Sequence, residues 1–187
     1  MNRTEMDKMR AGTFYNAFVP ELIEARARAA QLCDQLNRHG KSTPEKRRLL
    51  LEKLLGHCGE NVWVESPFLC DYGSEIFIGN NVFINFNCTI LDGAAVRIGN
   101  DVLLGPSVQI YSATHPTNWR IRKEGLEYAL PITIEDNVWI GGGVVICPGV
   151  TIGARSTIGA GSVITKNVPP DVVAAGNPCH VIRTVDA

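Results

Sequence analysis

The hydrophobic pattern of this chain has a period of six through most of its length. An aliphatic residue recurs every six positions, and a small or β-branched residue follows four positions later, as in Val138, Val144 and Ser156. Such a period does not fit a helix of 3.6 residues per turn, whereas it suits a short strand followed by a tight corner. The pattern therefore predicts a mainly β fold, a parallel β-helix in which three hexads form one coil and the aliphatic side chains line the interior. The aliphatic series is Ile78, Ile84, Ile90, Ile98, Leu104, Ile110, Ile134, Ile140, Ile146, Ile152, Ile158 and Ile164.

Before residue 60 the pattern changes to that of two helices. An apolar stripe opens at Pro20-Glu21-Leu22-Ile23, continues through Ala27, Ala30, Cys33 and Leu36, and ends at Gly40. A second helix is expected from the Thr43-Pro44-Glu45 entry signal to Gly56, with Leu49, Leu50, Leu54 and Leu55 on its apolar side. We expect a small helical cap over residues 1–59 and a β-helix domain with a C-terminal tail over residues 60–187.

One long interruption breaks the six-residue rule, between Ile110 and Ile132. Loops of this length inside a compact domain are usually functional or disordered. This one contains Trp119, Ile121 and Tyr128, more apolar material than a solvated linker carries. We therefore expect an ordered, projecting loop at residues 111–131.

Composition and charge exclude several classes of partner. The net charge is −1, with 11 Lys and Arg against 8 Asp and Glu in residues 1–60 and 7 against 11 in the remainder. Neither part is strongly basic, so a nucleic-acid partner has no electrostatic support. No apolar run is long enough to cross a membrane, and no leader sequence is evident. We expect a cytoplasmic protein without a membrane partner. Its six cysteines lack C-x-x-C spacing and are interpreted as free thiols, and no metal is expected.

Beyond the repeat, specific motifs resemble those of the galactoside and maltose O-acetyltransferases, a family of hexapeptide-repeat acyltransferases. The resemblance covers nearly the whole chain and implies a left-handed β-helix, a homotrimer, and acetyl-CoA as co-substrate without a metal. The motifs that carry it are Met9-Arg10-Ala11-Gly12, Cys70-Asp71-Tyr72-Gly73, Asn85-Phe86-Asn87, Ala113-Thr114-His115-Pro116, Asn137-Val138-Trp139-Ile140-Gly141, Pro148-Gly149-Val150, Thr165-Lys166 and Gly176-Asn177-Pro178.

Acetyl transfer to a hydroxyl needs a base that removes the proton as the oxygen attacks the thioester, and a neutral imidazole suits this role near pH 7. The resemblance places His115 in that role, at the point where the repeat fails. It also implies catalytic roles for Asn85 and for the Gly142 N–H, which would meet negative charge on the thioester oxygen. His39 and His57 are interpreted as structural or exposed, and His180 as a further candidate for cofactor contact.

The resemblance further implies two sets of binding residues. The sugar would be held by Asp71, Asn85, Asp92 and Glu127. Asp71 and Glu127 resemble the maltose branch, and Ala17 stands where the galactoside branch has an acidic residue, so a galactoside acceptor is disfavoured against maltose, glucose or a related glycoside. Acetyl-CoA would be held by Trp139, Gly142, Ala160, Thr165, Lys166 and Arg183, with Lys166 and Arg183 at its phosphates.

Two other functions remain open at this point. An N-acetyltransferase acting on an amine or antibiotic shares the solenoid and a loop histidine, but lacks the N-terminal cap. A non-catalytic β-helix used as an interaction module would need neither the Thr-His-Pro loop nor the run of cofactor residues. A γ-class carbonic anhydrase is excluded because it needs three histidines on zinc, and these four are scattered.

Overall fold

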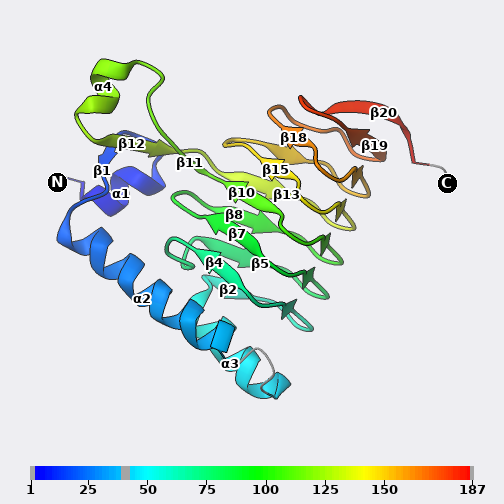
Figure 1. Cartoon of the computed structure of the whole chain (residues 1–187), viewed down its shortest axis with the longest axis horizontal. Coiled ribbons are helices and arrows are strands. Elements are labelled where there is room, and N and C mark those ends of the chain that lie inside the picture. Colours follow the sequence, from blue (N-terminus) through cyan, green and yellow to red (C-terminus); the bar gives the residue numbers. More distant parts are fainter. Residues whose placement is uncertain (1–2, 39–42, 186–187) are drawn as a thin grey trace.

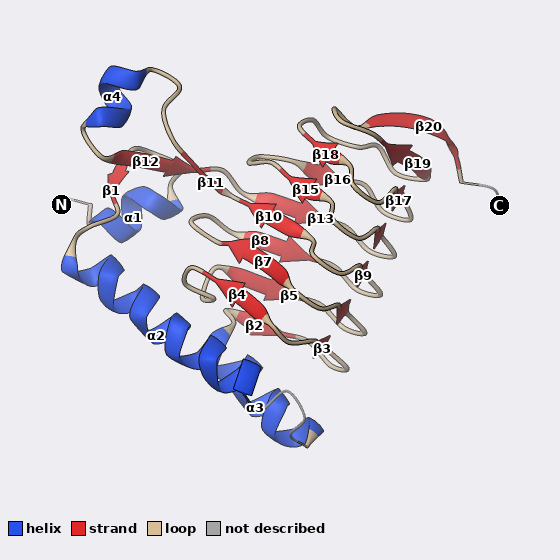
Figure 2. Ribbon diagram, viewed as in Figure 1, coloured by secondary structure: helices blue, strands red, loops and turns tan. Residues whose placement is uncertain are grey.

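The protein is a parallel β-solenoid with a helical cap at one end (Figures 1 and 2). The computed structural model describes residues 3–38 and 43–185. Within these residues, five successive coils contribute one strand each to three parallel sheets. The coils comprise β2 (His57–Cys58), β3 (Trp63–Val64) and β4 (Phe68–Cys70); β5 (Ile76–Ile78), β6 (Phe83–Ile84) and β7 (Cys88–Leu91); β8 (Val96–Ile98), β9 (Leu103–Leu104) and β10 (Gln109–Tyr111); β13 (Ile132–Ile134), β14 (Trp139–Ile140) and β15 (Val145–Ile146); and β16 (Thr151–Ile152), β17 (Thr157–Ile158) and β18 (Val163–Ile164).

The six-residue pattern determines the register between coils. Ile90, Ile110, Ile146 and Ile164 stand side by side in one sheet, and all are fully buried. The other two sheets stack their aliphatic residues in the same way, and every member of the predicted series is at most 3% exposed. The predicted solenoid and its interior are therefore confirmed. A final strand, β19 (Val172–Ala175), adds to β17 and pairs antiparallel with β20 (His180–Thr184).

The corners use residues that tolerate a left-handed backbone. Asn61, Asn81 and Asp101 occupy the same corner of successive coils with φ near +55° (54°, 57° and 57°). Their side chains form a ladder, since Asn61 donates to the Oδ1 of Asn81 at 3.0 Å and Asn81 to that of Asp101 at 3.0 Å. Polar corner residues in this fold thus satisfy one another's hydrogen-bonding groups. An asparagine at a corner can therefore have a purely structural role.

The cap consists of α1 (Glu5–Arg10), α2 (Pro20–Arg38) and α3 (Pro44–Leu54), and Figure 1 shows α2 alongside β4. The predicted stripe on α2 was partly wrong. Ala27 and Ala30 are exposed, because at about 100° per residue they lie away from the line through the buried residues. Leu49 on α3 is likewise 57% exposed. The buried face of α2 consists of Leu22, Ala29, Cys33 and Leu36.

The start of the solenoid differs by a few residues from the sequence-based expectation. The first strand, β2, already pairs with β5, so the solenoid begins at His57, a few residues before the expected domain boundary at residue 60. The Thr43 side chain accepts a hydrogen bond from the Lys46 N–H and caps α3 as predicted. Gly40, expected to end the first helix, and His39 lie outside the described residues.

The interruption at 111–131 is ordered, as predicted, and it projects from the side of the solenoid (Figure 1). It contains β11 (Ala113–Thr114), α4 (Trp119–Lys123) and β12 (Leu126–Ala129). β12 pairs antiparallel both with β11 and with β1 (Tyr15–Asn16), a short strand of the cap. The resulting three-stranded sheet joins the loop to the N-terminal segment, and the base of the loop is closed by the Leu130 N–H donating to the Ser112 carbonyl at 2.9 Å.

Candidate active site

A pocket of about 420 Å³ lies between the cap and the projecting loop. It brings together three of the residues predicted for catalysis and sugar binding: His115, Asp71 and Glu127. The cap contributes the opposite wall, because the β1–β12 pairing fixes the N-terminal segment against the loop. The complete lining is Tyr15, Ala17, Phe18, Arg26, Asp71, Tyr72, Leu91, Tyr111, Ala113, Thr114, His115 and Glu127.

The backbone of His115 is held from both sides. The preceding residue, Thr114, is paired with Tyr128 in the β11–β12 ladder. The following residue, Pro116, is buried, and its carbonyl accepts a hydrogen bond from Nη1 of Arg122 in α4 at 2.8 Å. His115 itself is exposed at the pocket. The loop therefore presents an accessible imidazole on a fixed backbone, which is the arrangement a general base requires.

The acidic groups of the pocket are partly buried and close to one another. Burial raises the pKa of the Asp71 carboxyl, the Arg26 guanidinium acts in the opposite direction, and Glu127 raises it further. Glu127 accepts a hydrogen bond from the Tyr15 hydroxyl at 3.1 Å. Burial, followed by the charge of Glu127, raises the pKa of Tyr15 well above its usual value, so the phenol stays protonated and donates.

Arg26 completes the wall on the cap side. Its Nη2 donates to the Ala17 carbonyl at 2.7 Å and its Nη1 to the Tyr72 hydroxyl at 2.8 Å. The pocket therefore combines carboxylates, a guanidinium and aromatic rings, groups that recognise polyhydroxyl compounds by hydrogen bonding and by stacking.

Asp92, expected to bind the sugar, is fully buried behind the pocket and does not line it. Its carboxylate accepts hydrogen bonds from the N–H groups of Asp71 (3.1 Å), Tyr72 (2.8 Å) and Glu75 (3.2 Å). Burial raises its pKa to about 6, although the hydrogen bonds from Tyr72 and Glu75 act in the opposite direction. In this structure Asp92 fixes the turn that carries Asp71 and Tyr72, so its influence on the pocket is indirect.

A second group of predicted residues lies at the corner that follows β6, β9, β14 and β17. Asn85 follows β6, and its Oδ1 accepts from the Phe86 N–H at 2.8 Å. Trp139, 55% exposed, stands in register beside Leu103, which is 48% exposed. Gly142 and Ala160 occupy the corner in consecutive coils, where the Gly161 N–H donates to the Gly142 carbonyl at 2.9 Å.

The backbone around Gly142 leaves one donor available. The N–H of Gly141 donates to the Ile158 carbonyl and that of Gly143 to the Pro106 carbonyl, both at 2.8 Å. For the Gly142 N–H, no acceptor is found among the described residues, and Gly142 is only partly buried. A fixed, accessible amide of this kind can stabilise a developing oxyanion.

The remaining cofactor candidates are spread over the last coils. Thr165 and Lys166 follow β18 and are exposed. Arg183 is in β20, paired with Val173, and its Nη1 donates to the Thr184 carbonyl at 3.0 Å. His180 begins the same strand and is exposed. These residues can meet an extended ligand, but they do not form one compact cluster.

His115 and Asp92, in and behind the pocket, lie at one end of the strands of one sheet, and the corner residues Asn85 and Gly142 lie at the other end. Each row of strand ends is called an edge of that sheet. Asn85 precedes β7 whereas Asp92 follows it, and β7 runs parallel to β10 with Ile90 beside Ile110. His115, which follows β10, is therefore on the edge of Asp92 and away from Asn85. At about 3.3 Å per residue, the strand between the edges separates them by on the order of 10 Å or more. Within one chain, His115 and Gly142 therefore follow and precede strands of the same sheet, at opposite ends of those strands.

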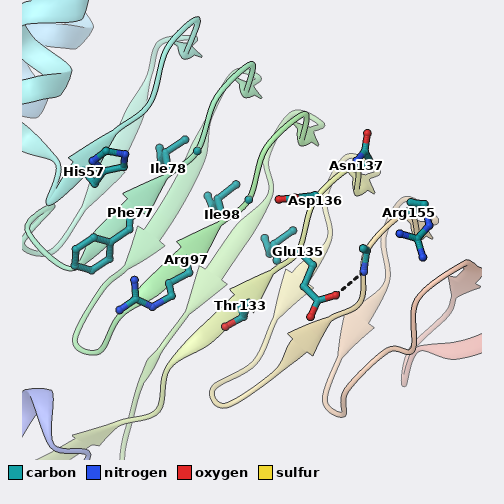
Figure 3. Close-up of a pocket in the computed structure, with 14 residues that line it drawn as sticks. His57, Phe77, Ile78, Arg97, Ile98, Thr133, Glu135, Asp136, Asn137 and Arg155 are labelled. Atoms are coloured by element: carbon teal, nitrogen blue, oxygen red, sulfur yellow. Dashed lines mark hydrogen bonds between the residues drawn. The ribbon is translucent and has the colours of Figure 1, made fainter.

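Another concavity, of about 550 Å³, lies on the outer face of the sheet formed by β2, β5, β8, β13 and β16 (Figure 3). Its charged groups are engaged with the protein. Glu135 accepts from the Ala154 N–H at 2.8 Å, Arg155 pairs with Asp171 at 2.6 Å, and Arg97 stacks over the Phe77 ring at 4.7 Å. His57 lines this groove and is exposed, which agrees with its interpretation as an exposed residue.

Sequence reasoning missed the contribution of the cap to the pocket. Tyr15, Phe18 and Arg26 line it, yet they belong to a two-residue strand, the turn after it and a helix, and carry no motif singled out from the sequence. Their role depends on the long-range pairing of β1 with β12, which no local pattern encodes. The one available signal was Ala17, whose position had been linked to acceptor choice and which does line the pocket.

No group of three or more His, Cys, Asp or Glu side chains within residues 3–38 and 43–185 is placed to hold a metal ion. None of the helices there combines the length and the apolar character needed to cross a membrane.

Comparison with known proteins agrees with this architecture. Residues 8–59 match the maltose acetyltransferase hexapeptide capping motif, and residues 131–166 match the bacterial transferase hexapeptide model of six repeats. Galactoside O-acetyltransferase of Escherichia coli (strain K12) is 47% identical over 186 residues, covering 100% of this chain and 92% of that protein.

Solved structures show the same fold over the whole chain. A maltose O-acetyltransferase from Clostridium difficile 630 superposes with a TM-score of 0.97 at 45% identity, covering 99% of each chain. A hexapeptide-repeat acetyltransferase from Vibrio cholerae O1 biovar eltor, complexed with acetyl coenzyme A, gives a TM-score of 0.91 at 40% identity, covering 99% of this chain and 100% of the other. With such identity from end to end, the chain belongs to the galactoside and maltose O-acetyltransferase family of hexapeptide-repeat acetyltransferases.

Proposed function

We propose that the protein transfers the acetyl group of acetyl-CoA to a hydroxyl of a sugar, with maltose, glucose or a related glycoside as acceptor. The observation that supports this most is the pocket between cap and loop, which His115, Asp71 and Glu127 line together. The carboxylates offer acceptors to sugar hydroxyls, and the imidazole removes the proton of the hydroxyl that attacks. The thioester of acetyl-CoA supplies the electrophilic carbonyl, and the attack on it is direct.

The second corner fits an acyl-CoA. The neighbouring exposed side chains of Trp139 and Leu103 offer apolar surface to the pantetheine arm. The Gly142 N–H is available to donate a hydrogen bond to the thioester oxygen. Ala160 continues this corner in the next coil. Thr165 and Lys166 follow β18, at the end of the strands where His115 lies, and Lys166 and Arg183 carry positive charge for the phosphates.

The separation of the two groups of residues leads to the proposed assembly. A base can act only within hydrogen-bond reach of the hydroxyl, which must itself approach the thioester. Because His115 and Gly142 lie at opposite edges of one sheet, we propose that the pocket of one copy meets the corner of another in a homotrimer, giving three shared sites. Asn85 then reaches the acceptor from the neighbouring copy.

A thiol-release assay tests the proposed reaction. With acetyl-CoA and maltose or glucose, free CoA should appear at a rate that depends on the sugar, and the product should be an ester cleaved by mild alkali. Glucosamine in the same panel detects N-acetylation, whose amide product resists alkali. A preference for the amine, or binding of acetyl-CoA without turnover on any acceptor, would replace this proposal by one of the two alternatives.

A further inference from the structure

The seam between the cap and the first coil brings two cysteines together. The Sγ atoms of Cys33 in α2 and Cys70 in β4 are 3.6 Å apart and share a hydrogen bond. Cys33 is 2% exposed, whereas Cys70 is only partly buried. All six cysteines are free thiols, and Cys88 donates instead to the Gly105 carbonyl at 3.3 Å.

The register of this seam determines the cysteine contact. The Asn37 side chain donates to the Phe68 carbonyl at 2.9 Å and accepts from the Phe68 N–H at 2.8 Å, which locks α2 against β4. One helical turn back from Asn37 is Cys33, and two strand residues beyond Phe68 is Cys70. Four helical residues and two strand residues both advance about 6 Å, so the steps from Asn37 to Cys33 and from Phe68 to Cys70 bring the two thiols together along the same seam.

We propose that Cys33 and Cys70 are a site of reversible disulfide formation, which ties the cap helix covalently to the solenoid when the protein meets a hydroperoxide. A covalent S–S bond is about 2 Å long, so the sulfur atoms must approach by about 1.5 Å, within the reach of side-chain rotation. The shared hydrogen bond lowers the pKa of Cys33 and raises that of Cys70, so Cys33 is the better nucleophile of the pair.

The chemistry balances with the peroxide as oxidant. One thiol attacks a peroxide oxygen, breaks the O–O bond and becomes a sulfenic acid, with release of water or an alcohol. The second thiol then attacks the sulfenic sulfur, forms the S–S bond and releases water. Two thiols lose two electrons and two protons in total, the peroxide is reduced, and a dithiol restores the starting state.

Peptide mapping of the intact full-length protein tests this site directly. After brief treatment with hydrogen peroxide and blocking of free thiols, we expect one intramolecular crosslink between the peptides of Cys33 and Cys70, four blocked cysteines, and reversal by dithiothreitol. The crosslink should raise the melting temperature by roughly 5–10 °C, because it closes a long loop in the unfolded chain.

Matched variants complete the experiment. Cys33→Ser and Cys70→Ser should abolish the peroxide-induced rise in melting temperature, whereas Cys58→Ser and Cys147→Ser should keep it. Because mapping of the wild-type protein needs no variant, misfolding of a variant does not affect the conclusion. Sulfinic acid at either residue without a crosslink, or a crosslink to another cysteine, would overturn the proposal.

Discussion

At the scale of single residues, His115 suits the role of general base because its backbone is fixed on both sides while its imidazole stays accessible. The β11–β12 ladder precedes it and the Arg122 contact to Pro116 follows it, so the side chain is accessible while its main chain is held. Removing the imidazole should therefore affect the chemical step without disturbing the fold.

We predict that His115→Ala lowers kcat by roughly 10²–10⁴-fold, the range for loss of a positioned general base, and leaves acetyl-CoA affinity nearly unchanged. Steady-state kinetics and titration calorimetry on one preparation measure both. His57→Ala is the matched control, because His57 lies in the groove on another sheet. If His115→Ala kept wild-type turnover, or instead lost acetyl-CoA binding, the assignment of the base would fail.

Asp92 gives a prediction about pH, because burial raises its pKa to about 6 from a usual value of 3.8. A carboxyl with a raised folded-state pKa stabilises the folded protein fully below the unfolded value, and this contribution is lost as pH rises through about 6. The melting temperature of wild type relative to Asp92→Asn should therefore be most favourable at the acid end, at about pH 4 and below, and decline towards pH 7. Because both proteins contain the neighbouring charged residues Asp71, Glu75 and Arg10, the contributions of these residues to the melting temperature largely cancel in the difference.

Thermal unfolding of both proteins across that pH range measures the effect. A gap that widens in favour of wild type as pH rises would mean that the carboxylate form is the stabilising one. Since Asp92 holds the turn of Asp71, the variant should also raise KM for the sugar more than that for acetyl-CoA.

The site residues show how far sequence reasoning can reach. His115, Asp71 and Glu127 were predicted from the resemblance to the family, and the structure places them around one pocket. Asp92 was expected in the same role, but an aspartate that follows a strand has the same sequence pattern whether its carboxylate faces a ligand or caps a turn. Only the three N–H contacts behind the pocket distinguish the two cases.

At the scale of elements, the β1–β12 pairing links the cap to the loop and shapes the pocket. Tyr15 in β1 faces Glu127 in β12 and donates to its carboxylate. Tyr15→Phe keeps the buried ring and removes only this donor. We expect a rise of roughly 2–10-fold in KM for the sugar, the size of one hydrogen bond, with acetyl-CoA affinity unchanged.

The matched control for this prediction is Tyr128→Phe. Tyr128 lies next to Glu127 in β12, but its ring packs edge to face on Phe14 with centroids 5.6 Å apart, and it does not line the pocket. Equal effects of the two substitutions on KM would show that the loop responds to any loss in β12, and not to the Glu127 contact.

The elements of the solenoid were predictable because their pattern is local and repeated, whereas those of the cap were predictable only in part. Each hexad contains its own aliphatic residue and corner, and the register follows from stacking. The stripe on α2 was misassigned at Ala27 and Ala30 because alanine is compatible with both faces of a helix. β1 has two residues and exists only through its partner, β12, so no periodicity could have predicted it.

At the scale of the whole molecule, the proposed assembly follows from the two edges of the sheet that contains β7 and β10. One chain places His115 at one edge and Asn85, Trp139 and Gly142 at or beside the other. We expect light scattering to give about three times the chain mass of 20.4 kDa. A monomer that turns over at assay concentration would show that a single chain completes the site.

Mixing two inactive variants tests the shared site most directly. His115→Ala lacks the base, and Trp139→Ala lacks the exposed ring of the cofactor corner, so homotrimers of each should be nearly inactive. After unfolding and refolding of an equal mixture, a site is complete when an intact His115 of one copy faces an intact Trp139 of another, which random assembly gives for about one quarter of the sites. The account predicts recovery of about one quarter of wild-type activity in the mixture. Activity that stays at the level of the separate variants would contradict a site shared between copies.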